Sequence, residues 1–194
     1  MPIKIRTLAL LGLGALALPA AAESYNPSWY GLAGVNTISA ENDWHAADNQ
    51  FGATLRLGKP LSQYFDVQLG ASRARSTDDG RSYRQTLGGA DLLLVGSRGK
   101  GRPFLLIGAG AENDKISAGS LDKSKTAPYI NAGAGVQAFF TDRFFAQADA
   151  RYVFGFIKDS EWGHSHSNNV LFNLGLGYAF GDAPKAAVVA PVVT

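Results

Sequence analysis

Cysteine is absent from this chain of 194 residues, so no disulfide frame, thiolate nucleophile or cysteine metal site can form. Basic residues also barely outnumber acidic ones. Lys4 and Arg6 account for the whole difference between 18 Lys and Arg and 16 Asp and Glu. The rest of the chain is therefore neutral, which does not favour nucleic acid as a partner. Mean hydropathy is only −0.03, a value that on its own is typical of a soluble protein.

The first 22 residues have the three parts of a secretory signal peptide. Lys4 and Arg6 are followed by the apolar run from Leu8 to Leu18, and then by Pro19 and three alanines ending at Ala22. A transmembrane helix needs about 20 apolar residues, and this run is too short. We predict that residues 1–22 are a signal peptide cleaved after Ala22.

In residues 170–180, large apolar residues alternate with small or polar residues, which predicts a strand with two different faces. One face is large and apolar: Val170, Phe172, Leu174, Leu176, Tyr178 and Phe180. The other is small or polar: Asn173, Gly175, Gly177 and Ala179. Lipid outside and a narrow lumen inside would produce this pattern, as in a strand of a transmembrane barrel.

Seven earlier segments have the same alternation: 29–35, 51–57, 65–72, 84–95, 104–112, 130–138 and 146–154. The predicted connections alternate between long (36–50, 73–83, 113–127, 155–169) and short (59–64, 96–102, 141–144). Outer-membrane barrels have long outer loops and short periplasmic turns. We predict an all-β fold over residues 23–181, an eight-stranded antiparallel up-and-down transmembrane β-barrel with both termini in the periplasm. Its lumen would be narrow enough for side chains to fill.

Charged residues within these strands are predicted to face the lumen, because a charge on the lipid face costs about 2–4 kcal/mol at mid-membrane for Arg or Lys. The candidates are Arg56, Asp66, Asp91, Glu112, Asp149 and Arg151. Arg56 and Asp66 belong to neighbouring strands near the same predicted turn. We expect an internal ion-pair network that plugs the barrel. The alternative is a set of independently hydrated side chains.

Aromatic residues gather near the predicted strand ends, as in the interfacial belts of membrane proteins. At the periplasmic ends these are Trp29, Tyr30, Phe65, Phe104, Phe139, Phe140, Phe144, Phe145 and Phe180. At the outer ends they are Phe51, Tyr129, Tyr152, Phe154 and Phe172. We predict two aromatic belts facing lipid.

No catalytic residue, metal site or cofactor is predicted. The stretch from His164 to Ser167 contains His and Ser, but the spacing does not pair a nucleophile with a base, and a polar loop explains it better. Glycine pairs such as Gly108 and Gly110 have neither a following helix nor the Lys-Ser/Thr of a phosphate loop. They are predicted to face the narrow lumen instead, as are Gly133 with Gly135 and Gly175 with Gly177.

Several segments resemble the N-terminal barrel of the OmpA/OprF family. They are Trp29-Tyr30, residues 103–110, the turn 140–145, the end 176–181 and the Ala/Pro/Val-rich segment 182–194, which has the composition of an extended linker. The last strand also looks like the C-terminal signal of bacterial outer-membrane barrels, with Asn173, Gly175, Tyr178 and Phe180 in the signal positions.

The resemblance implies a structural protein of the Gram-negative outer membrane, in contact with outer-membrane lipids, lipopolysaccharide and the barrel assembly machinery. It also implies that segment 182–194 leads to a periplasmic peptidoglycan-binding domain that is not in this chain. Three alternatives stay open: a small diffusion channel, a surface adhesin and, least favoured, an enzyme that modifies lipid A.

Overall fold

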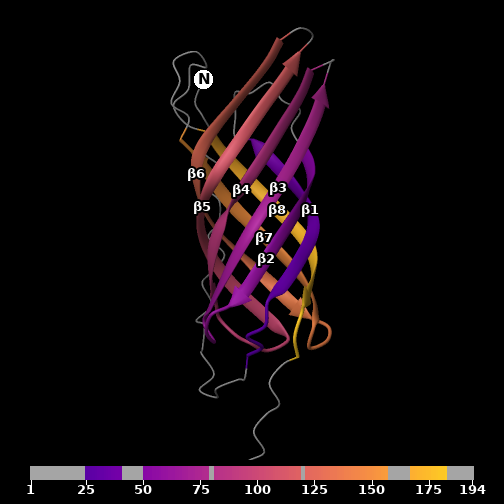
Figure 1. The fold of residues 1–194 in the computed structure, drawn as a ribbon, viewed down its shortest axis with the longest axis vertical. Helices are drawn as coiled ribbons and strands as arrows, with labels where there is room; N and C mark the ends of the chain where they lie inside the picture. The colour runs from indigo at the N-terminus through magenta and orange to yellow at the C-terminus, as the bar shows by residue number, and fades with distance from the viewer. Residues whose placement is uncertain (1–24, 41–49, 79–80, 119–120, 157–166, 183–194) are drawn as a thin grey trace, which may run out of the picture.

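The chain forms a closed antiparallel barrel of eight strands, each hydrogen-bonded to its neighbours in sequence and β1 also to β8 (Figure 1). The strands are β1 (Tyr30–Ala40), β2 (Gln50–Pro60), β3 (Phe65–Asp78), β4 (Arg81–Val95), β5 (Gly101–Ala118), β6 (Leu121–Phe139), β7 (Phe144–Gly155) and β8 (Ser167–Ala179). The computed structural model describes residues 25–40, 50–78, 81–118, 121–156 and 167–182. The predicted fold class is confirmed. The expected signal peptide and almost all of the expected linker lie outside the described residues, which contain no helix able to cross a membrane.

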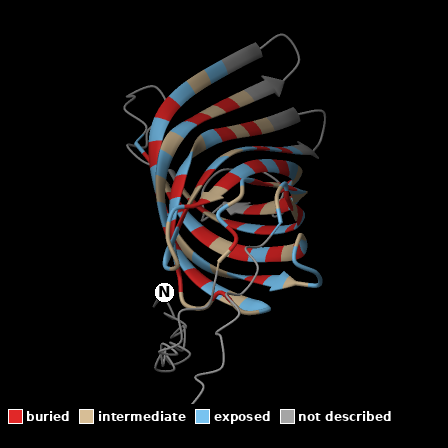
Figure 2. Ribbon diagram, turned by 60° about the horizontal axis from the view of Figure 1, so that its bottom comes forward, coloured by how far each residue is buried: buried red, intermediate tan, exposed pale blue. Residues whose placement is uncertain are grey.

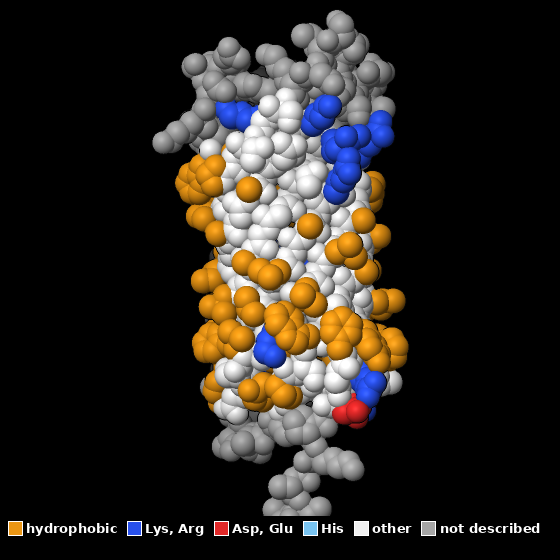
Figure 3. Space-filling model, in the orientation of Figure 1, with side chains coloured by type: hydrophobic (Ala, Val, Ile, Leu, Met, Phe, Trp, Pro, Cys, Tyr) orange, Lys and Arg blue, Asp and Glu red, His pale blue; other side chains and the backbone are white. Residues whose placement is uncertain are grey.

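Burial alternates along every strand, so each strand has one lumen face and one outer face (Figure 2). The outer face carries a broad band of exposed apolar side chains (Figure 3), including Phe51, Leu55, Ile107 and Leu176, each more than 60% exposed. These positions agree with the predicted outward set. In lipid, backbone groups have no water to bond, and closing the sheet gives every strand a partner on both edges.

Two of the predicted long loops are strand instead. β3 and β4 pair as far as Asp78 and Arg81, and β5 and β6 as far as Ala118 and Leu121. Only Asp79-Gly80 and Gly119-Ser120 separate these strand ends, and Gly-containing dipeptides are typical of two-residue hairpin connections. The prediction was wrong because these strand extensions lack an apolar face, while antiparallel pairing itself needs none.

Five aromatics predicted to face lipid lie inside the barrel, and one of them, Phe139, is partly buried and stacks on Phe145 with ring centroids 4.7 Å apart. The other four, Tyr30, Phe104, Tyr129 and Phe145, are between 1% and 6% exposed. Phe145 meets Tyr30 edge-on, with ring centroids 5.5 Å apart, in a cluster with Leu32 and Ala179. Part of the predicted belts is therefore an apolar core within the lumen. The outward aromatics include Phe51, Phe65, Phe140, Phe144, Phe172 and Phe180.

Glycines on the lumen face make room for these large side chains. A Cβ built on Gly177 would lie 2.1 Å from the Phe145 ring, and one on Gly58 would lie 2.2 Å from the Tyr30 ring. Gly135 faces Phe104 in the same way, at 2.5 Å. The predicted lumen position of the paired glycines is confirmed, and the narrow lumen is filled by setting one large side chain against one glycine.

Replacing Gly177 with valine tests this packing. The new side chain has to displace the buried Phe145 ring, so we expect Gly177→Val to lose about 1–3 kcal/mol, a typical cost of overpacking. The matched control is Gly88→Val on the outer face, where a Cβ meets nothing within 4 Å. Urea unfolding in lipid vesicles, followed by tryptophan fluorescence, measures both variants. Equal stability of the two would contradict the packing described here.

Candidate functional site

Four charged side chains meet at the centre of the lumen. Arg56 on β2 donates to Asp149 on β7, with 2.7 Å between Nη1 and Oδ2. Arg151, also on β7, bridges two carboxylates: its Nε lies 2.7 Å from Oδ1 of Asp149, and its Nη1 lies 2.6 Å from Oδ2 of Asp91 on β4. All four side chains are 8% exposed or less. We call these four residues the central cluster.

Amide side chains surround the central cluster and bind its carboxylates. Asn131 on β6 donates to Asp91 at 3.0 Å, and Asn173 on β8 donates to Asp149 at 2.9 Å. Gln147 donates to Asp149 at 3.1 Å, and its own oxygen accepts bonds from Gln68 on β3 and from Gln137. A buried charge is stable only when its remaining bonding positions are filled, and these amides fill many of them.

The same chain of hydrogen bonds continues to the end of the barrel with the short turns. Gln68 donates to the Tyr30 hydroxyl at 2.9 Å, and that hydroxyl donates to Asp66 at 3.2 Å. Asp66 pairs at 2.6 Å with Arg98, which lies in the β4–β5 turn. Arg98 also donates to the backbone carbonyls of Ser62 and Gln63 in the β2–β3 turn. Two turns are thus fastened to the lumen by one buried guanidinium.

The predicted lumen residues are placed as follows. All six face the lumen, and Arg56, Asp91, Asp149 and Arg151 are brought together. Arg56 and Asp66 do not pair with each other, since Arg56 binds Asp149 and Asp66 binds Arg98. Glu112 is 1% exposed on β5, beside Leu87 and Ala127.

Arg98 was missed because the prediction covered only charged residues within the strands, and Arg98 lies in the predicted connection 96–102. The sequence did contain an indication that Arg98 faces the lumen. Asp66 is inward at the end of a strand and needs a cation. The neighbouring β4–β5 turn offers Arg98, and Tyr30 reaches the same carboxylate from β1.

Little room is left beside the central cluster. The cavity beside the central cluster has a volume of about 20 Å³ and is lined by Thr54, Tyr129 and Val153 as well as the charged residues. That is space for a single water molecule. Side chains from seven of the eight strands join the bonded set, and Gly108 of β5 lies directly against Asp91. The described lumen is a packed polar core between apolar clusters.

The four residues of the predicted assembly signal are spread over both faces of β8. Asn173 binds the central cluster, and Gly175 lies against Leu32. Tyr178 packs on Phe144, with ring centroids 4.8 Å apart, and Phe180 is exposed on the outer face. Their role as an assembly signal stays a prediction.

Arg143 fastens β8 at the end with the short turns. Its guanidinium forms an ion pair with Asp182 and donates to the Tyr178 hydroxyl at 3.1 Å. The hydrogen bonds that Arg143 donates to Asp182 and Tyr178 raise the pKa of its guanidinium, so it keeps its charge. Nearby, Asn26 donates to the Gly181 carbonyl at 2.8 Å. Both ends of the described barrel therefore meet at this rim.

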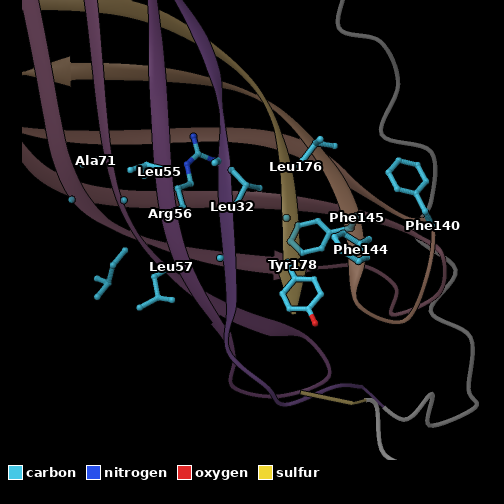
Figure 4. Close-up of a pocket in the computed structure, with 16 residues that line it drawn as sticks. Leu32, Leu55, Arg56, Leu57, Ala71, Phe140, Phe144, Phe145, Leu176 and Tyr178 are labelled. Atoms are coloured by element: carbon cyan, nitrogen blue, oxygen red, sulfur yellow. The ribbon is translucent and has the colours of Figure 1, made fainter. Parts of the chain in front are cut away.

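A shallow groove runs along β1 on the lipid side (Figure 4). Small residues of β1 line it: Ala33 lies between Leu55 of β2 and Leu176 of β8, and Gly31 lies opposite Leu57 of β2. Phe140 and Phe144, on either side of the β6–β7 turn, complete the lining. Its lining is almost entirely apolar, which suits an acyl chain and offers no chemistry.

The described residues hold no group of three or more His, Cys, Asp or Glu side chains that could bind a metal ion. Residues His164 to His166 lie outside the described part of the chain, and Ser167 is the first residue of β8. The charged side chains of the central cluster, together with Asp66 and Arg98, are engaged in bonds that hold the barrel together.

An apolar outer wall around a packed, charged interior defines a transmembrane barrel of the outer membrane. The chain belongs to the outer membrane protein beta-barrel domain family, whose model matches residues 8–180. It is therefore an outer-membrane protein.

Solved structures share this fold. Neisserial surface protein A is 14% identical, with a TM-score of 0.68 over 78% of this chain and 97% of that one. Ail, the attachment invasion locus protein of Yersinia pestis, is 17% identical, with a TM-score of 0.60 over 80% and 99%. The N-terminal β-barrel domain of Pseudomonas aeruginosa OprF is 21% identical, with a TM-score of 0.55 over 79% and 98%. At such identities the likeness shows the fold alone, and it confirms the family resemblance at that level.

Removing Arg151 tests the central cluster. Arg151→Ala leaves the buried Asp91 without its cation, and we expect a loss of about 3–5 kcal/mol, as for other broken buried pairs. Opening the centre of the lumen is also expected to raise single-channel conductance in planar bilayers.

The matched control is Arg143→Ala, which breaks an exposed ion pair at the rim. Exposed pairs contribute little to stability, so this variant is expected to keep the parent's melting temperature and conductance. If Arg151→Ala behaved like the control in both measurements, the central cluster would be neither a stabilising element nor a plug.

Proposed function

We propose that this chain is a structural barrel of the outer membrane, and that it anchors a periplasmic peptidoglycan-binding domain carried beyond segment 182–194. The observation that carries the proposal is the filled lumen, in which the central cluster and its amides connect opposite walls. These bonds fasten opposite walls to each other and leave a cavity of only about 20 Å³ beside the central cluster, which suits a structural role. Transport would instead require a continuous wet path.

Both termini are proposed to face the periplasm. The short turns, residue 25 and residue 182 lie at one rim of the barrel, where Tyr25 contacts the β2–β3 turn and Asn26 contacts Gly181. The extended β3–β4 and β5–β6 hairpins stand at the opposite rim (Figure 1). Outer-membrane barrels extend further on the outer side, and here that side would carry the two extended hairpins and the longer connections 41–49 and 156–166.

The linker reading supports the anchoring role. Segment 182–194 is rich in Ala, Pro and Val, which suits an extended connection between two folded parts. Arg143 ties Asp182 to the rim, so a following segment would leave the barrel at a fixed point on the proposed periplasmic side. The OprF structure similar to this chain is itself described as an N-terminal barrel domain.

A surface adhesin is the second candidate, favoured by one observation. β5 and β6 are 18 and 19 residues long, and a strand of about 10 residues is enough to cross the membrane, so this hairpin projects beyond it. Ail, whose structure has been solved with a heparin analogue, has the same fold. A diffusion channel is disfavoured by the packed lumen, and a lipid A-modifying enzyme draws no support from the described residues.

The absence of cysteine makes the proposed orientation easy to test. Asp142→Cys places a thiol in a short turn, and His164→Cys places one in the segment between β7 and β8. A membrane-impermeant maleimide applied to intact cells is expected to label His164→Cys, and to reach Asp142→Cys only after permeabilisation. The opposite labelling pattern would contradict the proposed orientation of the barrel in the membrane.

The intact mass of the native protein, extracted from outer membranes, tests the anchoring role. Cleavage after Ala22 would leave 172 of the 194 residues. We expect a mass well above that of 172 residues, together with retention on purified peptidoglycan. A mass equal to the 172-residue chain would exclude the anchoring role and leave the adhesin as the better proposal.

A further inference from the structure

The chain leaves β8 through residues 180–182, which we call the exit segment. On one side, the exit segment is held by the residues that lead into β1. The backbone N–H of Phe180 donates to the Trp29 carbonyl at 2.8 Å, and the Gly181 carbonyl accepts from the Asn26 side chain at the same distance. Water has little access to this second contact, because Asn26 is only 9% exposed.

On the other side, the exit segment is held by Arg143, in the turn that leads into β7. The Arg143 guanidinium donates to the Asp182 carboxylate through Nε and Nη2, and to the Tyr178 hydroxyl through Nη1 at 3.1 Å. Its backbone carbonyl accepts from the N–H of Ala179, the last residue of β8, at 2.9 Å. One residue of the β6–β7 turn therefore holds the chain before, at and after the end of β8.

The two segments that hold the exit segment are themselves braced. In the β6–β7 turn, the Thr141 hydroxyl accepts from the backbone N–H of Arg143 at 3.2 Å. Ahead of β1, the Trp29 ring lies under the ammonium group of Lys59 on β2, 5.1 Å from ring centroid to Nζ. A pull on the exit segment is therefore passed on to the β6–β7 turn on one side, and to β1 and β2 on the other.

The direction of a pull decides how an edge-paired strand yields. β8 pairs with β1 on one edge and with β7 on the other. The hydrogen bonds of an antiparallel ladder run perpendicular to the strands. A pull along β8 therefore loads all of them together, whereas a sideways pull at its end breaks them one after another. Because the exit segment is held from both sides, it cannot swing away from either neighbouring strand.

We propose that Asn26, Arg143 and the exit segment form a tension clamp, which keeps a pull on the tail in line with β8 and shares it between both neighbouring strands. The use of this clamp rests on the proposed anchoring role, in which a wall-bound domain pulls on the chain beyond residue 182. An exposed ion pair adds little to equilibrium stability. Forced unfolding is governed instead by the rate of rupture, so the same pair acts under load.

Single-molecule pulling tests the clamp on the signal-cleaved chain folded in a lipid bilayer. Because the chain has no cysteine, Thr194→Cys provides a unique handle on the tail. The measured quantity is the lifetime of β8 before its first rupture at a fixed force. We expect Asn26→Ala and Arg143→Ala each to shorten this lifetime about fivefold, and the double variant roughly 25-fold, since the net energy of one hydrogen bond corresponds to about a fivefold change in rate.

The matched control is Ser62→Ala/Arg102→Ala, which removes hydrogen-bonding side chains from the β2–β3 turn and from β5 at the same rim. This control is expected to keep the parent's lifetime. A second control pulls the double variant through Gly80→Cys, in the β3–β4 hairpin at the opposite rim. The lifetime measured there is expected to match the parent's, because the load then enters through other strands.

Two results would overturn the proposal. The first is a double-variant lifetime within about twofold of the parent's, less than one hydrogen bond would give. The second is an equal loss in the rim control or through the Gly80→Cys handle, which would show a general weakening of the barrel. Should the double variant fail to fold, Arg143→Ala alone, which breaks an exposed ion pair, carries the same test at about fivefold.

The pulling experiment needs no periplasmic domain, so its outcome is separate from that of the intact-mass measurement. A native mass equal to 172 residues would remove the source of the load and leave the clamp in place. Unchanged lifetimes would remove the clamp and leave the anchoring role in place.

Discussion

A backbone in lipid has no water to bond, and this constraint underlies every other feature of the barrel. It requires a closed ladder, which the pairing of β1 with β8 completes. Closure with eight strands makes the interior narrow, and a narrow interior has to be packed by side chains. The alternation of burial along each strand follows directly, because one face of a strand meets lipid and the other meets the lumen.

The lumen then does what the apolar core does in a water-soluble protein. Its lower part is apolar around Phe145 and Leu93, its middle is the central cluster, and a second apolar group includes Ile38 and Tyr129. Asp149 shows how closely the polar part is specified, since it accepts bonds from Arg56, Arg151, Gln147 and Asn173. Because one carboxylate accepts four bonds, opening the interior for transport would break several hydrogen bonds at once.

Period-two alternation was enough to predict the fold, the number of strands and the inward direction of the charged residues. It was not enough to predict which charged residues pair with each other. Arg56 reaches across the lumen to Asp149, 93 positions away, and alternation alone does not give the strand register. The same alternation could have shown that not all of the predicted belt aromatics face lipid. Phe144 and Phe145 are adjacent, so only one of them can face lipid, and the structure turns Phe145 inward. The hairpin extensions were not predicted, because strands that pair in water need no alternating apolar residues. Arg98 was not predicted to face the lumen, because it lies in a turn.

The extended hairpins also divide the chain into a part that can vary and a part that cannot. Within the membrane, a one-residue insertion would turn every following side chain of a strand to the wrong face. Beyond the membrane, the ends of β3 and β4 pair only with each other and with β5, and both faces there can be polar. Changes in length at a hairpin tip leave the lumen untouched. The hairpin tips can therefore accept insertions and new sequences that the packed membrane part of the barrel cannot.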